Sequence, residues 1–190
     1  HHSTGIHGHR YLYSVLARRG YANIAYQVLT NPEFPSQAYI INAGHTTWPE
    51  RQWEWASDIE WDRSLNHQMH SGFAAFFHEA VGGIIPLPNH PGYKKFVLKP
   101  IPLDSLTEAE TILDSPYGRI RSHWTKNSDN FKWIIEIPPN TKAEVYVPTR
   151  NPGTVSINGQ MVSDTNPSGE QPYFEMDLLS GKYIITASQK

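Results

Sequence analysis

The sequence predicts an α+β chain in which a helical half is followed by a β half, and three observations support this prediction. In the first half, apolar residues recur at the three-to-four spacing of one helix face. After residue 92 the period changes to two, which is typical of short strands with one buried face. Between the halves, Pro86–Gly92 (PLPNHPG) has the proline and glycine content of a linker. We therefore expect two domains, residues 1–91 and residues 92–190.

Composition excludes several classes of protein. The 190 residues are 38% hydrophobic and 18% charged, which is typical of a globular chain rather than a disordered one. With a net charge of −2, no basic stripe and no long apolar run, the sequence indicates neither a nucleic-acid partner nor a membrane span. The absence of cysteine excludes disulfides and thiolate metal sites, and leaves a periplasmic, secreted or cytoplasmic location open. Ten histidines and six tryptophans are unusual, and aromatic faces with dispersed polar groups suit sugar ligands.

Three helices are predicted in the first half. The first covers residues 9–19 and ends at Arg18-Arg19-Gly20, a common C-terminal signal. The second covers residues 22–30 and stops before the segment NPEFP, because a residue that precedes proline disfavours the helical conformation. The third covers residues 66–80, with three phenylalanines and an alanine on one face. Three helices with long connections are few for an independent domain, which favours part of a helical toroid whose other helices lie upstream.

Six short strands are predicted in the second half, separated by turn-forming residues. Their segments are YKKFVLKP, GRIRSHWT, FKWIIEIP, AEVYVPT, TVSING and KYIITAS. Large apolar side chains occupy every second position from Phe131 to Ile137, and Asn158-Gly159 predicts a two-residue hairpin. Strands at this close spacing predict an antiparallel β-sandwich, with Trp124 and Trp133 in its core.

The connection between the second and third predicted helices contains the most unusual segment, GHTTWPERQWEW, from Gly44 to Trp55. It holds three tryptophans and two glutamates in twelve residues, while glycine, proline and threonine interrupt any regular period. Long irregular connections are usually functional or disordered, and the tryptophan content argues against disorder. Trp48, Trp53 and Trp55 are candidates to stack on sugar rings, and packing at the rim of the domain is the alternative for each one taken singly.

Five segments, taken together, form a specific pattern. They are STGIHGHRYLYSVLARRGYANIAYQVL, FPSQAYIINAGHTTWPERQWEW, SLNHQMHSGFAAFFHEAVGGI, PGYKKFVLKP and SPYGRIRSHW. Their order and spacing, from about residue 2 to about residue 148, resemble the C-terminal part of bacterial α-L-rhamnosidases of glycoside hydrolase family 78. The resemblance implies that residues 1–91 are the last helices of an (α/α)6 barrel and that residues 92–190 are a C-terminal β-sandwich. It also implies hydrolysis of a terminal α-L-rhamnoside, in a glycoside or polysaccharide, with inversion and without a cofactor.

Inversion requires a carboxylic acid that protonates the leaving oxygen and a carboxylate that activates water on the opposite face of the sugar. In the family, the base is the Glu of a GATT-x-W-E segment, and GHTTWPE aligns Glu50 with it. Two positions depart from the family pattern: His45 replaces the usual Ala, and Pro49 replaces the Trp before the Glu, with Trp48 one position earlier. Because Glu50 keeps its offset from the threonine pair, the resemblance implies that Glu50 is the base. It also implies that His67 of LNHQMH is a sugar-binding residue near that base.

Other interpretations of these residues remain open. An ordinary surface salt bridge is the alternative for Glu50, and Glu54, four residues further on, is the rival carboxylate. A helix-capping or core role is the alternative for His67. The histidine pairs His7-x-His9 and His67-x-x-His70 have metal-ligand spacing, but neither has a third ligand nearby, so we expect no metal.

The family's general acid lies upstream, in an Asp-rich segment of the earlier barrel helices, and these 190 residues contain no equivalent. We therefore expect this chain alone to be inactive and to act with the upstream part of the same enzyme. Another (α/α)6 glycoside hydrolase of different sugar specificity is the alternative within enzymes. A non-catalytic carbohydrate-binding fragment, which would expose aromatic side chains on one sheet face, and a purely structural remnant are the alternatives outside them.

Overall fold

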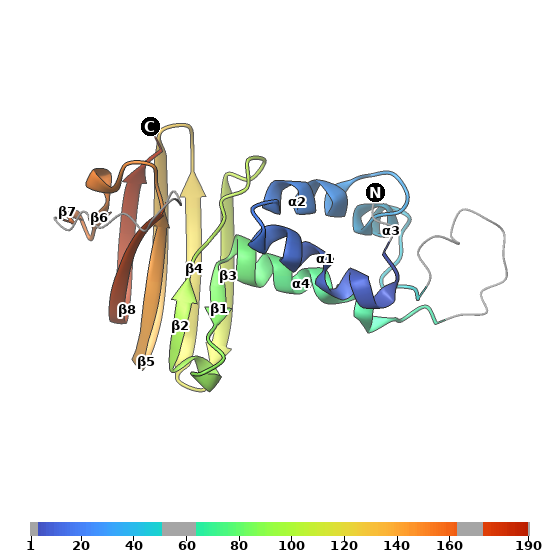
Figure 1. Ribbon diagram of the computed structural model, residues 1–190, viewed down its shortest axis with the longest axis horizontal. Helices are drawn as coiled ribbons and strands as arrows, with labels where there is room; N and C mark the ends of the chain where they lie inside the picture. The colour runs from blue at the N-terminus through green and yellow to red at the C-terminus, as the bar shows by residue number, and fades with distance from the viewer. Residues whose placement is uncertain (1–3, 51–63, 163–172, 190) are drawn as a thin grey trace. The chain divides into compact units, whose positions relative to one another are not determined.

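The computed structural model describes residues 4–50, 64–162 and 173–189, and the chain divides into two compact units (Figure 1). The first unit is His1–Phe77 and the second is His78–Lys190. The first contains helices and the second contains an eight-stranded sheet, so the predicted α+β class is confirmed. None of the described helices is long and apolar enough to cross a membrane.

Three α-helices begin the first unit, and a composite helix leads out of it. The elements are α1 (Ile6–Arg18), α2 (Ala22–Thr30), α3 (Gln37–Asn42), the 3₁₀ helix η1 (Gln68–Gly72), α4 (Phe73–Ala75) and the π-helical η2 (Phe76–Val81). The helices predicted at residues 9–19 and 22–30 are confirmed, although α1 begins earlier than expected, at Ile6. The helix predicted at residues 66–80 is present, but its hydrogen-bond pattern changes twice along its length.

Helix α3 lies inside the segment that we expected to be an irregular connection. Ser36 caps this helix, because its hydroxyl accepts a hydrogen bond from the Tyr39 N–H at 2.9 Å. A serine here satisfies an N–H that has no partner within the helix. With only 6 residues, α3 is too short to display a helical period in the sequence, and its cap was the available signal.

Helix α1 packs against α2 and η1. His9, Tyr13 and Ala17 follow each other at four-residue spacing on its buried face. The Tyr13 ring lies beside the Phe76 ring, with centroids 6.4 Å apart. Two of the three buried positions of α1 therefore carry polar side chains, which is unusual for a helix core and needs partners to satisfy them.

The second unit contains one sheet with the strand order β1-β2-β5-β8-β6-β7, in which β4 also pairs with β5 and β3 pairs with β4. Its strands are β1 (Ile84–Pro86), β2 (Lys95–Leu98), β3 (Glu108–Ser115), β4 (Gly118–Lys126), β5 (Asn130–Pro148), β6 (Ser156–Ile157), β7 (Gln160–Met161) and β8 (Tyr173–Ser188). A short 3₁₀ helix lies at Pro91–Tyr93 and another at Pro152–Thr154. Strands β2 and β5 are parallel, whereas the other pairs are antiparallel. This pair differs from the antiparallel expectation because the β3–β4 hairpin separates β2 from β5 in sequence and supplies the long connection that parallel pairing requires.

Strand β5 joins two segments that we predicted as separate strands. It runs beside β8 along its whole length, and its register shifts between Ile137 and Lys142 (Figure 1). Pro138 and Pro139 fall in this interruption, and Asn140 there has a φ of 60°. The residues before the interruption pair with β4, and those after it pair with β2. Proline normally ends a strand pattern, which is why the sequence predicts two strands where the structure has one interrupted strand.

Trp124 and Trp133 are fully buried, so their predicted place in the core of the β half is confirmed. The indole of Trp133 donates a hydrogen bond to the Ser122 hydroxyl at 2.9 Å, and the indole of Trp124 donates to the Val81 carbonyl at 2.8 Å. Phe131 stacks on Trp124 with ring centroids 6.3 Å apart. Both indole N–H groups are therefore satisfied, as buried indoles require.

The hairpin predicted at Asn158-Gly159 is confirmed, since it joins β6 to β7 and both residues have positive φ. Strand β3 was not predicted. Its sequence, EAETILDS, contains three acidic residues, which are depleted in strands.

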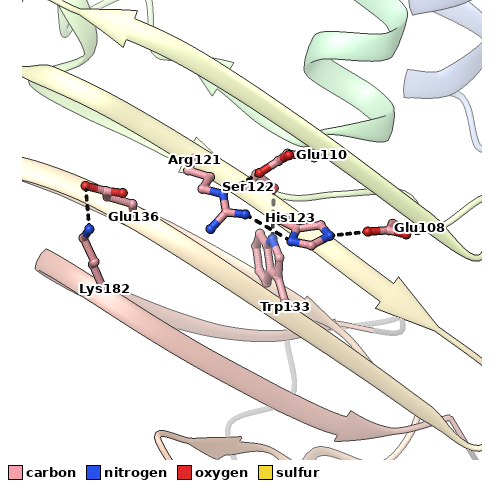
Figure 2. A network of polar contacts seen from close by, with 8 residues as sticks. All are labelled: Glu108, Glu110, Arg121, Ser122, His123, Trp133, Glu136 and Lys182. Atoms are coloured by element: carbon pink, nitrogen blue, oxygen red, sulfur yellow. Dashed lines mark hydrogen bonds and ion pairs between the residues drawn. The ribbon is translucent and has the colours of Figure 1, made fainter.

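Figure 2 shows how two of these acidic residues are accommodated. Glu108 accepts a hydrogen bond from His123 at 2.6 Å, and Glu110 accepts one from Arg121 at 2.5 Å, with both partners on β4. On the neighbouring strands, Glu136 lies 3.4 Å from Lys182. Cross-strand hydrogen bonds from β4 thus stabilise a strand that its own composition disfavours.

Candidate functional site

Two short segments of the first unit lie side by side around Glu50. The Glu50 N–H donates a hydrogen bond to the Ser64 carbonyl at 2.8 Å, and the His67 N–H donates to the Trp48 carbonyl at 2.5 Å. The Thr47 hydroxyl, which belongs to the threonine pair of the motif, donates to a backbone carbonyl of residue 65 at 2.6 Å. Residues 47–50 and 64–67 are therefore fixed to each other, which brings the predicted base and the predicted sugar-binding histidine into one place.

The Glu50 side chain is half-buried. Within residues 4–50, 64–162 and 173–189, no hydrogen bond or ion pair engages its carboxylate. The salt bridge that is the alternative interpretation of Glu50 is thus not seen in this part of the chain. A carboxylate that no cation holds keeps its oxygens available to accept a proton.

His67 is the N-cap residue of η1, but its side chain makes no capping hydrogen bond. Its Nε2 atom is buried, and none of the described residues provides it with a hydrogen-bond partner. Buried polar atoms are nearly always paired with protein, water or ligand. The capping alternative for His67 is therefore wrong for the side chain, and a polar ligand atom is one partner that could satisfy Nε2.

Trp48 is half-buried, and its ring meets the Phe73 ring edge to face, with centroids 5.1 Å apart. This contact holds one side of the indole against the protein. Trp53 and Trp55, the other candidates for stacking on sugar, lie outside the described residues, as does the rival carboxylate Glu54. Their roles stay predictions.

A second histidine, which the motif analysis did not select for this site, contacts Glu50 directly. The His70 Nε2–H donates a hydrogen bond to the Glu50 backbone carbonyl at 2.7 Å. Its side chain is 1% exposed, and burial lowers the pKa of the His70 imidazole. The neutral ring, with its hydrogen on Nε2, is therefore the form that the folded protein favours.

His70 belongs to a larger buried polar cluster. The His9 ring meets the His70 ring edge to face at 4.9 Å between centroids, and the His9 Nε2 hydrogen-bonds with the Gln37 side chain. The Tyr13 hydroxyl donates to Gln37 Oε1 at 2.6 Å, and burial raises the pKa of Tyr13. Polar residues at His9 and Tyr13, where the helical period predicts a buried face, were the signal that could have revealed this cluster.

The described residues contain no group of three or more His, Asp or Glu side chains arranged to hold a metal ion. His67 and His70 lie close together, with ring centroids 5.7 Å apart, but His70 uses its Nε2–H on a backbone carbonyl. The arrangement places the Glu50 carboxylate near two imidazoles, those of His67 and His70.

Two protein-family models match the sequence in succession. The bacterial alpha-L-rhamnosidase 6 hairpin glycosidase domain matches residues 1–81, and the bacterial alpha-L-rhamnosidase C-terminal domain matches residues 83–161. An alpha-L-rhamnosidase of Formosa agariphila is 40% identical over 193 aligned residues, which cover 100% of this chain and 20% of the relative. An alpha-L-rhamnosidase of Streptomyces avermitilis is 32% identical over 163 residues, which cover 82% of this chain and 15% of the relative.

Solved structures agree with these matches. The alpha-L-rhamnosidase from Dictyoglumus thermophilum superimposes with a TM-score of 0.87 and 28% identity, covering 100% of this chain and 21% of that one. The Streptomyces avermitilis alpha-L-rhamnosidase complexed with L-rhamnose gives a TM-score of 0.84 and 29% identity, covering 97% of this chain and 18% of that one. The chain spans about a fifth of the length of the relatives that it matches. Residues 1–81 and 83–161 match two different rhamnosidase domains in succession, and the chain belongs to the bacterial α-L-rhamnosidase family.

Proposed function

We propose that these residues form part of an inverting α-L-rhamnosidase in which Glu50 is the general base. The observation that supports the role most directly is the state of Glu50. Its backbone is held by hydrogen bonds, while its half-buried carboxylate has no cation partner among the described residues. In an inverting glycosidase, the base removes a proton from a water as that water attacks the anomeric carbon. The general acid would come from a segment outside these 190 residues.

His67 and Trp48 are the proposed sugar contacts on the described part of the site. The Nε2 of His67, which has no partner among the described residues, can exchange a hydrogen bond with a sugar hydroxyl, which would satisfy an otherwise costly buried atom. Trp48 keeps part of its indole exposed, and such a face suits the C–H surface of a pyranose. Trp53 and Trp55 are proposed to complete the aromatic wall. A solved relative holds L-rhamnose, which supports a rhamnose-containing glycoside or polysaccharide as the substrate class.

The proposed architecture follows the same assignment. Residues 1–91 would be the last helices of an (α/α)6 barrel, and residues 92–190 would be a C-terminal β-sandwich. The match of residues 1–81 to a six-hairpin glycosidase domain supports the first part. The long strand β5, which pairs with β4 over its first part and with β2 over its second, supports the second part because such a strand can contribute to two packed layers.

The base assignment is tested by Glu50→Gln in the enzyme that contains these residues together with the rest of its glycosidase domain. Hydrolysis of an aryl α-L-rhamnoside should lose about 10²-fold or more in kcat, because the amide cannot accept the proton of water. The matched control is Glu33→Gln, the same chemical change at an exposed carboxylate of the first unit, and its turnover should stay within about 2-fold of wild type. A loss of only a few-fold in Glu50→Gln, with substrate binding intact, would refute the assignment.

Two further measurements separate the base role from loss of fold. NMR of the first product formed should show β-L-rhamnose, the inverted anomer, before mutarotation. In Glu50→Ala, azide should restore turnover and yield the β-L-rhamnosyl azide, because this small anion occupies the space of the missing carboxylate and attacks without a base. Rescue cannot occur if the variant is merely unfolded. Retention of the α anomer would contradict the inverting mechanism.

A further inference from the structure

The structure assigns a positioning role to His70: we propose that its imidazole, braced by His9, Gln37 and Tyr13, fixes the backbone of Glu50 and thereby aims the carboxylate. This proposal rests on the proposed function of Glu50 as the base. His70 would not touch the substrate. It would act on catalysis only through the residue that it holds.

Hydrogen bonds hold the peptide groups on both sides of Glu50 in place. On one side, the Glu50 N–H donates to the Ser64 carbonyl at 2.8 Å. On the other side, the Glu50 carbonyl accepts from His70 Nε2–H at 2.7 Å. Fixing both peptides fixes φ and ψ at Glu50, and with them the direction in which its side chain leaves the backbone. A displacement of about 1 Å in a catalytic group can lower a rate about 10²-fold.

The position of His70 is itself tightly determined. Helix η1 approaches α1 so closely that a Cβ added to Gly72 would lie 2.5 Å from the Arg10 carbonyl oxygen. This approach places His70 against His9, which is fully buried on α1. The Nε2 of His9 hydrogen-bonds with Gln37, and Gln37 accepts from the Tyr13 hydroxyl at 2.6 Å. Side chains from α1 and α3 therefore brace the ring that holds Glu50.

Because the side chain at position 70 is buried, the presence of a histidine there calls for an explanation. The ring is 1% exposed, and its Nδ1 is buried with no hydrogen-bond partner among residues 4–50, 64–162 and 173–189. A phenylalanine would place a somewhat larger ring at the same position without burying polar atoms, which is costly unless they are paired. What a phenylalanine cannot supply is the hydrogen bond to Glu50. A need for the hydrogen bond to the Glu50 carbonyl would therefore explain why a histidine is buried at position 70.

The test compares two substitutions of His70 in the same full-length enzyme. His70→Phe keeps a ring of similar size beside His9 but removes the donor, and kcat should fall about 10- to 100-fold. KM should change less than about 3-fold, because the proposed sugar contacts are untouched. His70→Gln can still donate an amide N–H to the Glu50 carbonyl and should keep at least about a third of the wild-type kcat. Thermal unfolding of each variant verifies that it is folded at the assay temperature.

A double-mutant cycle with Glu50→Gln distinguishes positioning from a general structural role. If His70 acts through Glu50, then His70→Phe should reduce the residual turnover of Glu50→Gln by less than about 2-fold. Losses that multiply in the double variant would overturn the proposal, since they would mean that His70 supports the fold at large. If His70→Phe does not fold, His70→Gln carries the test alone, and a loss above about 10-fold in that folded variant would overturn it.

The failures of the two proposals are distinguishable. Near wild-type turnover in Glu50→Gln would overturn the base assignment, and the positioning role with it. Near wild-type turnover in His70→Phe, in an enzyme that Glu50→Gln inactivates, would overturn the positioning role alone.

Discussion

Gly72 is where the packing of η1 against α1 can be tested most sharply. Gly72 has φ −57° and ψ −19°, a conformation that alanine adopts readily. Replacing glycine by alanine at such a position normally stabilises a protein by about 0.4–1 kcal/mol, because the unfolded chain becomes less flexible. On backbone conformation alone, Gly72→Ala should therefore be a stabilising change.

The neighbours of Gly72 reverse that expectation. An added Cβ would lie 2.5 Å from the Arg10 carbonyl oxygen and 2.8 Å from the Arg10 Cα. Both atoms are backbone within α1, so no side chain can rotate away. The two elements would have to separate by roughly 0.5–1 Å to reach ordinary contact, and overpacking of this kind costs about 1–3 kcal/mol. The clash outweighs the entropic gain, and we expect a net destabilisation of about 1–2 kcal/mol.

The assay is urea unfolding followed by tryptophan fluorescence, with Gly5→Ala as the matched control. A Cβ at Gly5 would meet nothing within 4 Å, and the residue lies at the start of the same helix α1. We expect this control to change the unfolding free energy by less than about 0.5 kcal/mol. Stabilisation of the protein by Gly72→Ala would refute the close approach of η1 to α1, and with it the reasoning that places His70.

Two further predictions concern buried groups. Burial lowers the pKa of His70, and His67 nearby lowers it further while the Glu50 carbonyl and carboxylate oppose the shift. The unfolded chain then binds more protons below pH about 6.5, so the contribution of His70 to stability is full above that pH and is lost as the pH falls below it. Unfolding free energies measured from pH 7.5 to pH 5 should fall more for wild type than for His70→Gln, and parallel curves would contradict this. In the β half, Trp133→Phe removes a donor to Ser122 and leaves a void, and calorimetry should show a loss of about 1–3 kcal/mol with turnover unchanged.

Much of the fold could be predicted because the spacing of apolar residues is visible within the sequence of each single element. Helix α2 matches its predicted residues, and the Asn158-Gly159 hairpin needs only two residues with positive φ. Strand β3 could not be predicted in this way, because Glu108 and Glu110 are unfavourable until β4 supplies His123 and Arg121. The continuity of β5 was hidden for a similar reason. Two prolines interrupt its pattern locally, while pairing with β8 continues on both sides of them.

The residues of the candidate site also include some that the sequence could identify and one that it could not. Glu50 and His67 stand in recognisable motifs, so the sequence was enough to select them, and their catalytic and sugar-binding roles stay predictions. His70 could not be selected, because its partner is a backbone carbonyl 20 residues earlier in the chain. A residue pattern reports the positions of side chains along one element, and it carries no information about which carbonyl of another segment will need a donor. Only the packing of η1 on α1 brings the two together.

The way Glu50 is held suits the role of general base that we propose for it. A glutamate anchored through its own carboxylate, for instance by an arginine, would be well positioned but would be a weaker base, since a cation favours the ionised form. A glutamate that no hydrogen bond holds would keep its basicity, but the direction of its carboxylate would not be fixed. Hydrogen bonds to the backbone on both sides meet both requirements, because they fix the origin of the side chain and leave its oxygens without a partner among the residues that the structure describes. On the proposed role of His70, the buried polar face of α1, which is unusual as a helix core, would have a physical reason: it supports the donor that holds the Glu50 carbonyl.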